Sequence, residues 1–391
     1  MKKRIIQITG VIVTLAMFGV ILAFVIVPPY FDWSMNAVER TQPYAPSEET
    51  TALHDTLFVA DMHSDSLLWN RNLLVENGRG HVDIPRLAKG NVALQAFTIV
   101  TKTPKSMNYE NNTGDTDNIT TLAIMQRWPS ETYSSLLERA LYQAEKLYAF
   151  EAKSNGALTI ITSGRGFDAF LEKRAADPNA VAGLLGIEGA HCLEGDIKNI
   201  DVLFDAGIRM MGITHFFDNE LGGSAHGVSK GGLTDFGRAC VTKMEEKNIL
   251  IDLAHASPAV IDDVLDMATR PVAMSHGGVK GTCDRTRNLS DDHVKRIADT
   301  GGVVAIGYWD EAVCGLDAQS IVKAILHAVS AGGIDHVGLG SDFDGVITAP
   351  FDTAGLAEIT EELMKQGLPE PDIAKIMGEN VQRLLRESLP E

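Results

Sequence analysis

The chain has 391 residues, a formal net charge of −18 and a hydrophobic content of 45%. This composition is typical of a folded globular protein and argues against a disordered chain. The acidic balance argues against nucleic acid or an anionic membrane surface as a binding partner. Four cysteines are too few for a disulfide scaffold or a Cys₄ zinc module.

The N-terminus combines a basic start, Met1–Arg4, with an uncharged apolar run over residues 5–27. A helix of this length spans about 35 Å, enough to cross a bilayer core of about 30 Å. The run ends in Val27-Pro28-Pro29 without a small-residue cleavage site, which favours an uncleaved signal-anchor over a cleaved signal peptide. We therefore expect residues 1–27 to form a single-pass anchor in the cell membrane. The basic residues before it predict an extracytoplasmic main domain, periplasmic or extracellular.

Residues 28–50 contain four prolines together with Ser, Thr and Glu, and this composition predicts a linker. The main domain would then occupy residues 51–391. A further apolar run at 157–162 is expected to be a peripheral strand. Eight other short apolar segments, which alternate with helical patterns, are expected to be strands: 57–62, 93–100, 183–187, 208–214, 250–254, 271–275, 303–309 and 336–341.

Eight strand–helix repeats predict an α/β fold of the (β/α)₈ TIM-like barrel type. The alternative is an open doubly wound sheet, but the first strand–helix turn lacks a glycine-rich dinucleotide fingerprint. In a barrel, the carboxyl ends of the strands form the active face. Side chains able to bind a metal follow six of the eight expected strands: His63 and Asp65, Glu188, His215, His255, His276, and Asp342.

Only eleven histidines occur in the chain, and four of them fall at these strand ends. Imidazole and carboxylate groups are the ligands of Zn²⁺ and related cations, and five or six strand ends can surround two ions. Glu188 lies between glycines, which allow close approach, and could bridge two cations. Asp344, Asp252 and Asp61 are expected to have supporting roles around the ligands.

Several motifs, in this order, resemble those of the membrane (renal-type) dipeptidases, which are zinc metallopeptidases on an amidohydrolase-like barrel. The resemblance extends from about Thr51 to the C-terminus. It depends on Asp61-Met62-His63-Ser64-Asp65, Gly80-His81-Val82-Asp83-Ile84-Pro85-Arg86-Leu87, Gly186-Ile187-Glu188-Gly189-Ala190-His191, Ser275-His276 and Gly340-Ser341-Asp342-Phe343-Asp344-Gly345.

The resemblance implies a role for each candidate residue. His63 and Asp65 would bind a first zinc, His255 and His276 a second, and Glu188 would bridge the two. Asp342 would transfer the proton, and His215 would contact the substrate and the developing oxyanion. Arg287 would hold the substrate carboxylate, with Arg285 as a rival for that role.

The activity implied is hydrolysis of dipeptides that carry a free C-terminal carboxylate, by a hydroxide that bridges the two metal ions. A related barrel hydrolase that cleaves another amide or a lactam is the alternative, and a catalytically inactive binding protein is a third. The resemblance also implies a homodimer and a Cys283–Cys314 disulfide, although four free thiols remain open as an interpretation of the residues themselves. The segment Met377-Gly378-Glu379-Asn380 resembles a helix-capping turn of amidohydrolase relatives and is expected to be structural.

Overall fold

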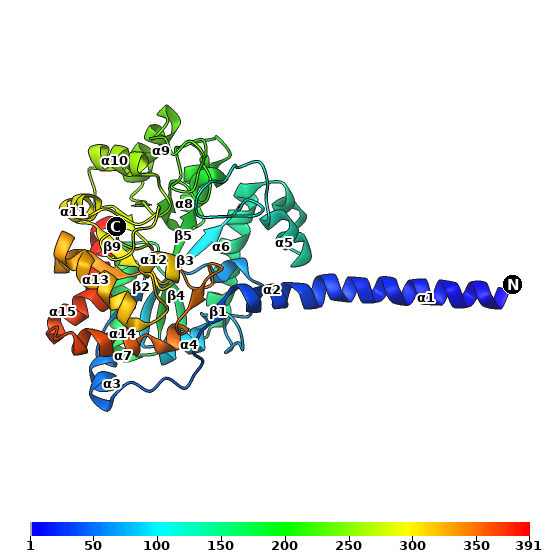
Figure 1. Cartoon of the computed structure of the whole chain (residues 1–391), viewed down its shortest axis with the longest axis horizontal. Coiled ribbons are helices and arrows are strands. Elements are labelled where there is room, and N and C mark those ends of the chain that lie inside the picture. Colours follow the sequence, from blue (N-terminus) through cyan, green and yellow to red (C-terminus); the bar gives the residue numbers. More distant parts are fainter. Residues whose placement is uncertain (1) are drawn as a thin grey trace.

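The computed structural model describes residues 2–391. A long helical rod at the N-terminus projects away from the rest of the chain (Figure 1). It consists of α1 (Lys2–Ile21) and α2 (Val27–Met35), joined by a π-helical turn at Leu22–Ile26. By length and apolar composition, one helical stretch of the described residues, Met17–Met35, could cross a membrane. Only 11% of this stretch is buried inside the protein, and apolar side chains before it, such as Val13, are exposed.

Eight parallel strands form a closed barrel, in the order β3-β2-β10-β9-β8-β7-β6-β5. The barrel closes because β3 also pairs with β5, in register from Leu94↔Ala182 to Val100↔Glu188. The predicted (β/α)₈ fold is therefore confirmed, and each expected strand is found. The strands are β2 (Val59–Asp61), β3 (Val92–Val100), β5 (Val181–Glu188), β6 (Ile208–Gly212), β7 (Leu250–Asp252), β8 (Ala273–Met274), β9 (Val303–Ile306) and β10 (Val337–Leu339).

The run expected to be peripheral is β4 (Leu158–Ile160), which pairs with the beginning of β5 and lies outside the closed barrel. Helices cover the outside of the barrel (Figure 1). They are α3 (Glu48–His54), α4 (Ile84–Lys89), α5 (Ile119–Met125), α6 (Leu136–Lys153), α7 (Gly164–Ala176), α8 (Asn199–Asp205), α9 (Asp235–Glu246), α10 (Pro258–Met267), α11 (Asp291–Asp299), α12 (Asp310–Val313), α13 (Ala318–Gly332), α14 (Ala357–Lys365), α15 (Glu370–Ala374) and α16 (Asn380–Ser388).

Alternation along β3 shows how the strands separate two apolar layers. Leu94 and Ala96 belong to one buried cluster, while Phe97 and Ile99 belong to the larger cluster that also contains the apolar faces of the covering helices. Thr98 continues the first series toward the carboxyl end of the strand, where it donates a hydrogen bond to Asp65. Apolar packing thus gives way to polar side chains at the carboxyl ends of the strands.

Residues 28–50, expected to be a linker, are instead ordered against the barrel. After α2, the short strand β1 (Ala37–Val38) pairs in parallel with β11 (Thr348–Ala349). Helix α3 follows, and His54 at its end contacts Thr360 of α14. The sequence suggested a linker because prolines are frequent here, but long-range pairing with residues 348–349 decides the structure.

Gly378 lies in the segment expected to be structural, at a point where the backbone of Phe58 comes close to it. It lies in the π-helical turn Lys375–Glu379, and a Cβ atom there would lie 1.9 Å from the carbonyl oxygen of Phe58. A methyl group at this position would therefore displace the backbone that leads into β2.

We expect Gly378→Ala to destabilise the protein by about 1–3 kcal/mol, as overpacking of a filled site does. Gly164→Ala is the matched control, because its new Cβ would only reach ordinary contact distance, 3.7 Å from Pro390 O. Urea unfolding followed by circular dichroism measures both variants. Equal stability of Gly378→Ala and the wild type would contradict the packing described here.

Candidate active site

The candidate metal-binding side chains meet at the carboxyl end of the barrel. His63 and Asp65 follow β2, Glu188 ends β5, and His255 and His276 come shortly after β7 and β8. All five are buried, with exposed fractions of 3% or less. Parallel strands bring their carboxyl ends to one face, so residues more than 200 positions apart become neighbours.

Glu188 lies at the centre of this cluster. Its Oε1 atom is 3.0 Å from His255 Nε2, 3.4 Å from His276 Nε2 and 3.5 Å from His63 Nε2. Asp65 Oδ1 also lies 3.5 Å from His63 Nε2. The two nitrogens His255 Nε2 and His276 Nε2 are only 3.0 Å apart. Three imidazoles and two carboxylates therefore direct ligand atoms at one small volume.

His215 and Asp342 lie beside the five candidate ligands. His215 Nε2 is 3.4 Å from Glu188 Oε2, and the two form a further potential metal-binding group with His255. Asp342 Oδ1 is 3.9 Å from His63 Nε2. The structure thus brings together all seven side chains singled out at the strand ends.

Two of these residues, His255 and Asp342, adopt left-handed backbone conformations, with φ of 61° and 62°. Non-glycine residues rarely adopt such angles, and they concentrate at functional sites. Gly189, directly after Glu188, has a φ of 86°, and a Cβ there would lie 2.9 Å from His215 Cβ. A glycine at this position lets the β5 and β6 ends approach each other closely.

Ser275 determines which ring nitrogen carries the hydrogen in two of the histidines. Its hydroxyl donates to Asp252 Oδ2 at 2.6 Å, so its oxygen can only accept from the two Nδ1 atoms that face it. These atoms are His276 Nδ1 at 2.9 Å and His63 Nδ1 at 3.1 Å. Hydrogen on Nδ1 leaves both Nε2 lone pairs free for a metal ion.

Charge and burial make this cluster unfavourable without a cation. Burial, followed by the negative charge of Asp65, raises the pKa of Glu188 well above its usual value. Burial would lower the pKa of His63, but Glu188, Asp65 and Asp342 raise it to about 10. The buried carboxylates therefore concentrate negative charge, which a cation bound among them would stabilise.

The remaining histidines are neutral in this environment. Burial lowers the pKa of His215, His255 and His276 well below the usual value, and neighbouring positive charges lower it further. Neutral imidazole is the form that binds metals. In addition, the buried atoms His63 Nε2 and Glu188 Oε2 have no hydrogen-bond partner. Buried polar atoms without partners, in a set of histidines and carboxylates, fit a bound divalent metal ion.

Burial, with a contribution from Asp65, raises the pKa of Asp342 to about 7. A carboxyl group with such a pKa can both accept and release a proton near neutral pH. The side chain lines a small cavity of about 40 Å³, together with Glu188, His215, His255, Arg287 and Tyr109. This cavity is the space open to a substrate beside the cluster.

The two candidate arginines have different surroundings. Arg287 is buried, with its guanidinium 4.9 Å from the Trp309 ring and a single long hydrogen bond of 3.4 Å to His276 O. Its Nε atom has no hydrogen-bond partner. Arg285 has a side chain 47% exposed and pairs with Glu311. Only Arg287 therefore lies where it can meet a ligand in the cavity.

The supporting residues are also where the sequence suggested. Asp252 binds Ser275, as described, and Asp61 Oδ1 accepts from the backbone nitrogens of His63 and Ser341. Asp344 accepts from the backbone of His81 and from the Ser66 hydroxyl. These bonds hold the strand ends, and Asp252 also forms a further potential metal-binding group with His63 and His276.

The structure adds residues that sequence reasoning did not single out. Ser275 is part of the Ser275-His276 motif, but the sequence predicted no role for the serine itself. Tyr109 lies in the long segment between β3 and α5, far from any strand end, and it reaches the cavity with Arg287. The Cys283–Cys314 disulfide that the resemblance implied is present and closes the loop carrying Arg287, while Cys192 and Cys240 are free and buried.

We expect Ser275→Ala to weaken metal binding by about 10–100-fold, because His63 and His276 lose the bond that fixes their tautomer. Competition with a fluorescent chelator measures the dissociation constant. Ser290→Ala serves as the control, because Ser290 caps α11 and makes no contact with the cluster. Metal affinity equal to that of the wild type in Ser275→Ala would rule out this role of the serine.

Comparison with known proteins places the chain in a family. The model of the membrane dipeptidase family (peptidase family M19) matches residues 47–389. An uncharacterized dipeptidase of Schizosaccharomyces pombe is 26% identical over 343 residues, which cover 84% of this chain and 77% of the relative. Dipeptidase aclJ of Aspergillus oryzae is 32% identical over 218 residues, 53% of this chain and 52% of that protein.

Solved structures share the fold. A metallo peptidase from Rhodobacter sphaeroides, liganded with a phosphinate mimic of the dipeptide L-Ala-D-Ala, is 24% identical with a TM-score of 0.71; the match covers 85% of this chain and 99% of that one. The probable dipeptidase PvdM from Pseudomonas aeruginosa is 19% identical with a TM-score of 0.72, over 87% and 98% of the two chains. Since the family match covers nearly the whole barrel domain, the chain belongs to the membrane dipeptidase family, peptidase family M19, and is a metallo-dipeptidase.

Proposed function

We propose that this protein is a membrane-anchored dinuclear zinc dipeptidase that cleaves dipeptides with a free C-terminal carboxylate. The observation that carries the proposal is the position of Glu188, whose Oε1 lies within 3.5 Å of Nε2 of three histidines from three other strand ends. A carboxylate at that point can bind two cations at once, and two-metal sites place their ions about 3.5–4 Å apart.

The donor set divides into two groups around Glu188. His63 and Asp65, both after β2, would hold one zinc ion, and His255 and His276 would hold the other. Nitrogen and carboxylate oxygen donors suit Zn²⁺. When bound, two zinc ions sharing a water lower its pKa and supply a hydroxide nucleophile near neutral pH.

Residues beside the ligands provide the rest of the chemistry. Asp342, whose pKa is raised to about 7, accepts the proton of the attacking water and delivers it to the leaving amine. His215 is neutral because burial lowers its pKa, and an N–H of its ring can donate to the oxygen of the scissile carbonyl. Both side chains line the same cavity, so a single bound peptide can reach both.

Arg287 explains a preference for short substrates with a free carboxylate. A buried guanidinium whose Nε lacks a partner is costly unless an anion binds it. A carboxylate can satisfy it through two parallel hydrogen bonds. Arg287 lines the same cavity as Glu188 and His255, so a short substrate whose carboxylate binds Arg287 can also reach the metal cluster. This geometry supports cleavage of dipeptides over longer peptides.

The helical rod supports attachment to a membrane. Helices α1 and α2 form a continuous rod of about 50 Å, and apolar side chains such as Ile8, Val13 and Phe18 are exposed along it. Asp32, near its end, is buried against the barrel, so the last turns lie at the domain surface. The apolar residues before them would cross the bilayer, and the basic start would keep the barrel on the extracytoplasmic side.

Substitution of Arg287 tests the proposed substrate class. We expect Arg287→Ala to lower kcat/KM for L-Ala-L-Ala and L-Ala-D-Ala by roughly two orders of magnitude, because the substrate carboxylate loses its partner. Arg285→Ala is the matched control, and we expect activity close to that of the wild type. The full-length protein in detergent is assayed by release of free alanine.

The same variant separates the proposal from its alternative. C-terminally amidated dipeptides lack the carboxylate, so the wild type should cleave them poorly and Arg287→Ala should cleave them no worse. Full dipeptidase activity in Arg287→Ala would refute the carboxylate clamp and favour another amide or a lactam as substrate.

A further inference from the structure

The end of the membrane-proximal helix is joined to the barrel by a buried ion cluster. Asp32, in the last turn of α2, is 1% exposed and accepts a hydrogen bond from Arg79 Nε at 2.7 Å. Arg71 Nε lies 3.3 Å from the same carboxylate oxygen, Oδ2. A buried carboxylate is stable only when paired, so Asp32 and the two arginines fix one another in place.

Arg71 extends this cluster to the loop after β10. Its Nη2 lies 2.5 Å from Asp344 Oδ2, and both side chains are fully buried. Burial would raise the pKa of Asp344, but Arg71 and the hydrogen bonds from His81 and Ser66 hold it well below the usual value. Asp344 is therefore an anion placed between the barrel and the membrane-proximal helix, two residues after Asp342.

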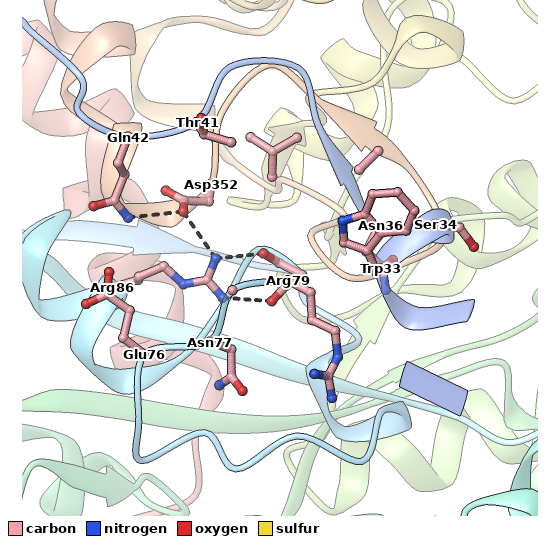
Figure 2. Close-up of a pocket in the computed structure, with 14 residues that line it drawn as sticks. Trp33, Ser34, Asn36, Thr41, Gln42, Glu76, Asn77, Arg79, Arg86 and Asp352 are labelled. Carbon is pink, nitrogen blue, oxygen red and sulfur yellow. Dashed lines mark hydrogen bonds and ion pairs between the residues drawn. The ribbon is translucent and has the colours of Figure 1, made fainter. Parts of the chain in front are cut away.

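Asn36, directly after α2, makes a second link to the same loop. Its Oδ1 accepts from the backbone N–H of Val346 at 3.0 Å, and its Nδ2 donates to Asp32 Oδ1 at 3.0 Å. The chain then continues into β1, which pairs with β11 just beyond the loop. Figure 2 shows Asn36 and Arg79 beside the pocket that this segment forms with residues 76–80, Arg86 and Asp352.

The loop needs such links because its backbone is strained. Asp342, Asp344 and Val346 have φ values of 62°, 65° and 65°. Left-handed conformations are costly for residues other than glycine, most of all for a β-branched residue such as Val346, and persist only where surrounding contacts enforce them. Gly345 and Val346 line the candidate active-site cavity with Asp342. Movement of the loop would therefore move the proton-transferring carboxylate.

We propose that Asp32 and Asn36 are positioning residues, which hold the loop of residues 342–346 and thereby place Asp342 for proton transfer. The segment that leaves the membrane is then part of the active-site structure and not only a tether. The inference rests on the proposed function for the role of Asp342, but the contact between Asn36 and the loop can be tested without substrate.

The test uses the full-length protein in detergent with Asn36→Ala. Loss of the acceptor for Val346 N–H should accelerate hydrogen exchange at this amide about tenfold, the effect of one lost hydrogen bond. We expect kcat for L-Ala-D-Ala to fall at least about tenfold through misplacement of Asp342. The KM should stay within about twofold and the metal content should not change, because Arg287 and the ligands lie elsewhere.

Two further variants separate positioning from general loss of structure. Asn36→Gln keeps both the amide oxygen that accepts from Val346 N–H and the amide nitrogen that donates to Asp32, and we expect it to retain more of the kcat than Asn36→Ala does. Arg40→Ala breaks the ion pair of the same segment with Glu358 of α14, away from the loop, and should leave kcat and Val346 exchange unchanged.

Two results would overturn the inference. One is unchanged exchange at Val346 in Asn36→Ala, which would show that the contact does not hold the loop. The other is faster exchange with an unchanged kcat, which would show that the loop position does not govern catalysis. A wild-type protein that cleaves no dipeptide would instead refute the proposed function, while the exchange measurement would still decide whether Asn36 holds the loop.

Discussion

The burial of several like charges in one place is the constraint on which this structure depends. Glu188, Asp65 and Asp342 are carboxylates with almost no access to water, and they lie around the same imidazole, His63. Carboxylates in this setting must be protonated or neutralised by positive charge. Neutral histidines with free Nε2 atoms complete a set of donors that a divalent cation can satisfy. The fold can be understood as the arrangement that brings these groups together and keeps them there.

The barrel achieves this in layers. Closure of β3 onto β5 fixes where Glu188 stands relative to the other strand ends. Behind the candidate ligands, Ser275 and Asp252 fix the orientation of two imidazoles, and Asp61 holds the backbone at His63 and Ser341. Outside these, the segment that follows the N-terminal helical rod is bonded to the loop after β10. Each set of contacts limits the movement of the residues inside it. This suits a site where a small displacement of a reacting group would change reactivity.

Much of the fold could be predicted from the sequence, because short apolar runs alternate regularly with helical patterns. The candidate ligands could be predicted for the same reason, since a polar residue that ends an apolar strand of a barrel has a known location. The position of Glu188 among three histidines follows from the strand order. The peripheral strand β4 could also be predicted, because the apolar run at 157–162 is additional to the eight runs expected to form the barrel.

Other features depend on long-range contacts that local patterns do not contain. Prolines at 28, 29, 43 and 46 suggested a linker, yet pairing of β1 with β11 and burial of Asp32 between two arginines order this segment. Tyr109 reaches the cavity from a long loop without any periodic signal. The sequence left Arg285 and Arg287 as rivals. Only the structure distinguishes them, because Arg287 lies against the Trp309 ring at the cavity while Arg285 is exposed and paired with Glu311.

The most direct test of the account is metal content measured together with activity, on the full-length wild type and on Glu188→Gln. Elemental analysis by mass spectrometry gives the zinc per chain, and hydrolysis of L-Ala-L-Ala is followed before and after chelation. We expect about two zinc ions per wild-type chain, activity lost on chelation and restored by zinc, and loss of both metal and activity in Glu188→Gln. Wild-type protein that cleaves dipeptides equally well without metal, or Glu188→Gln with full metal content and full activity, would contradict it.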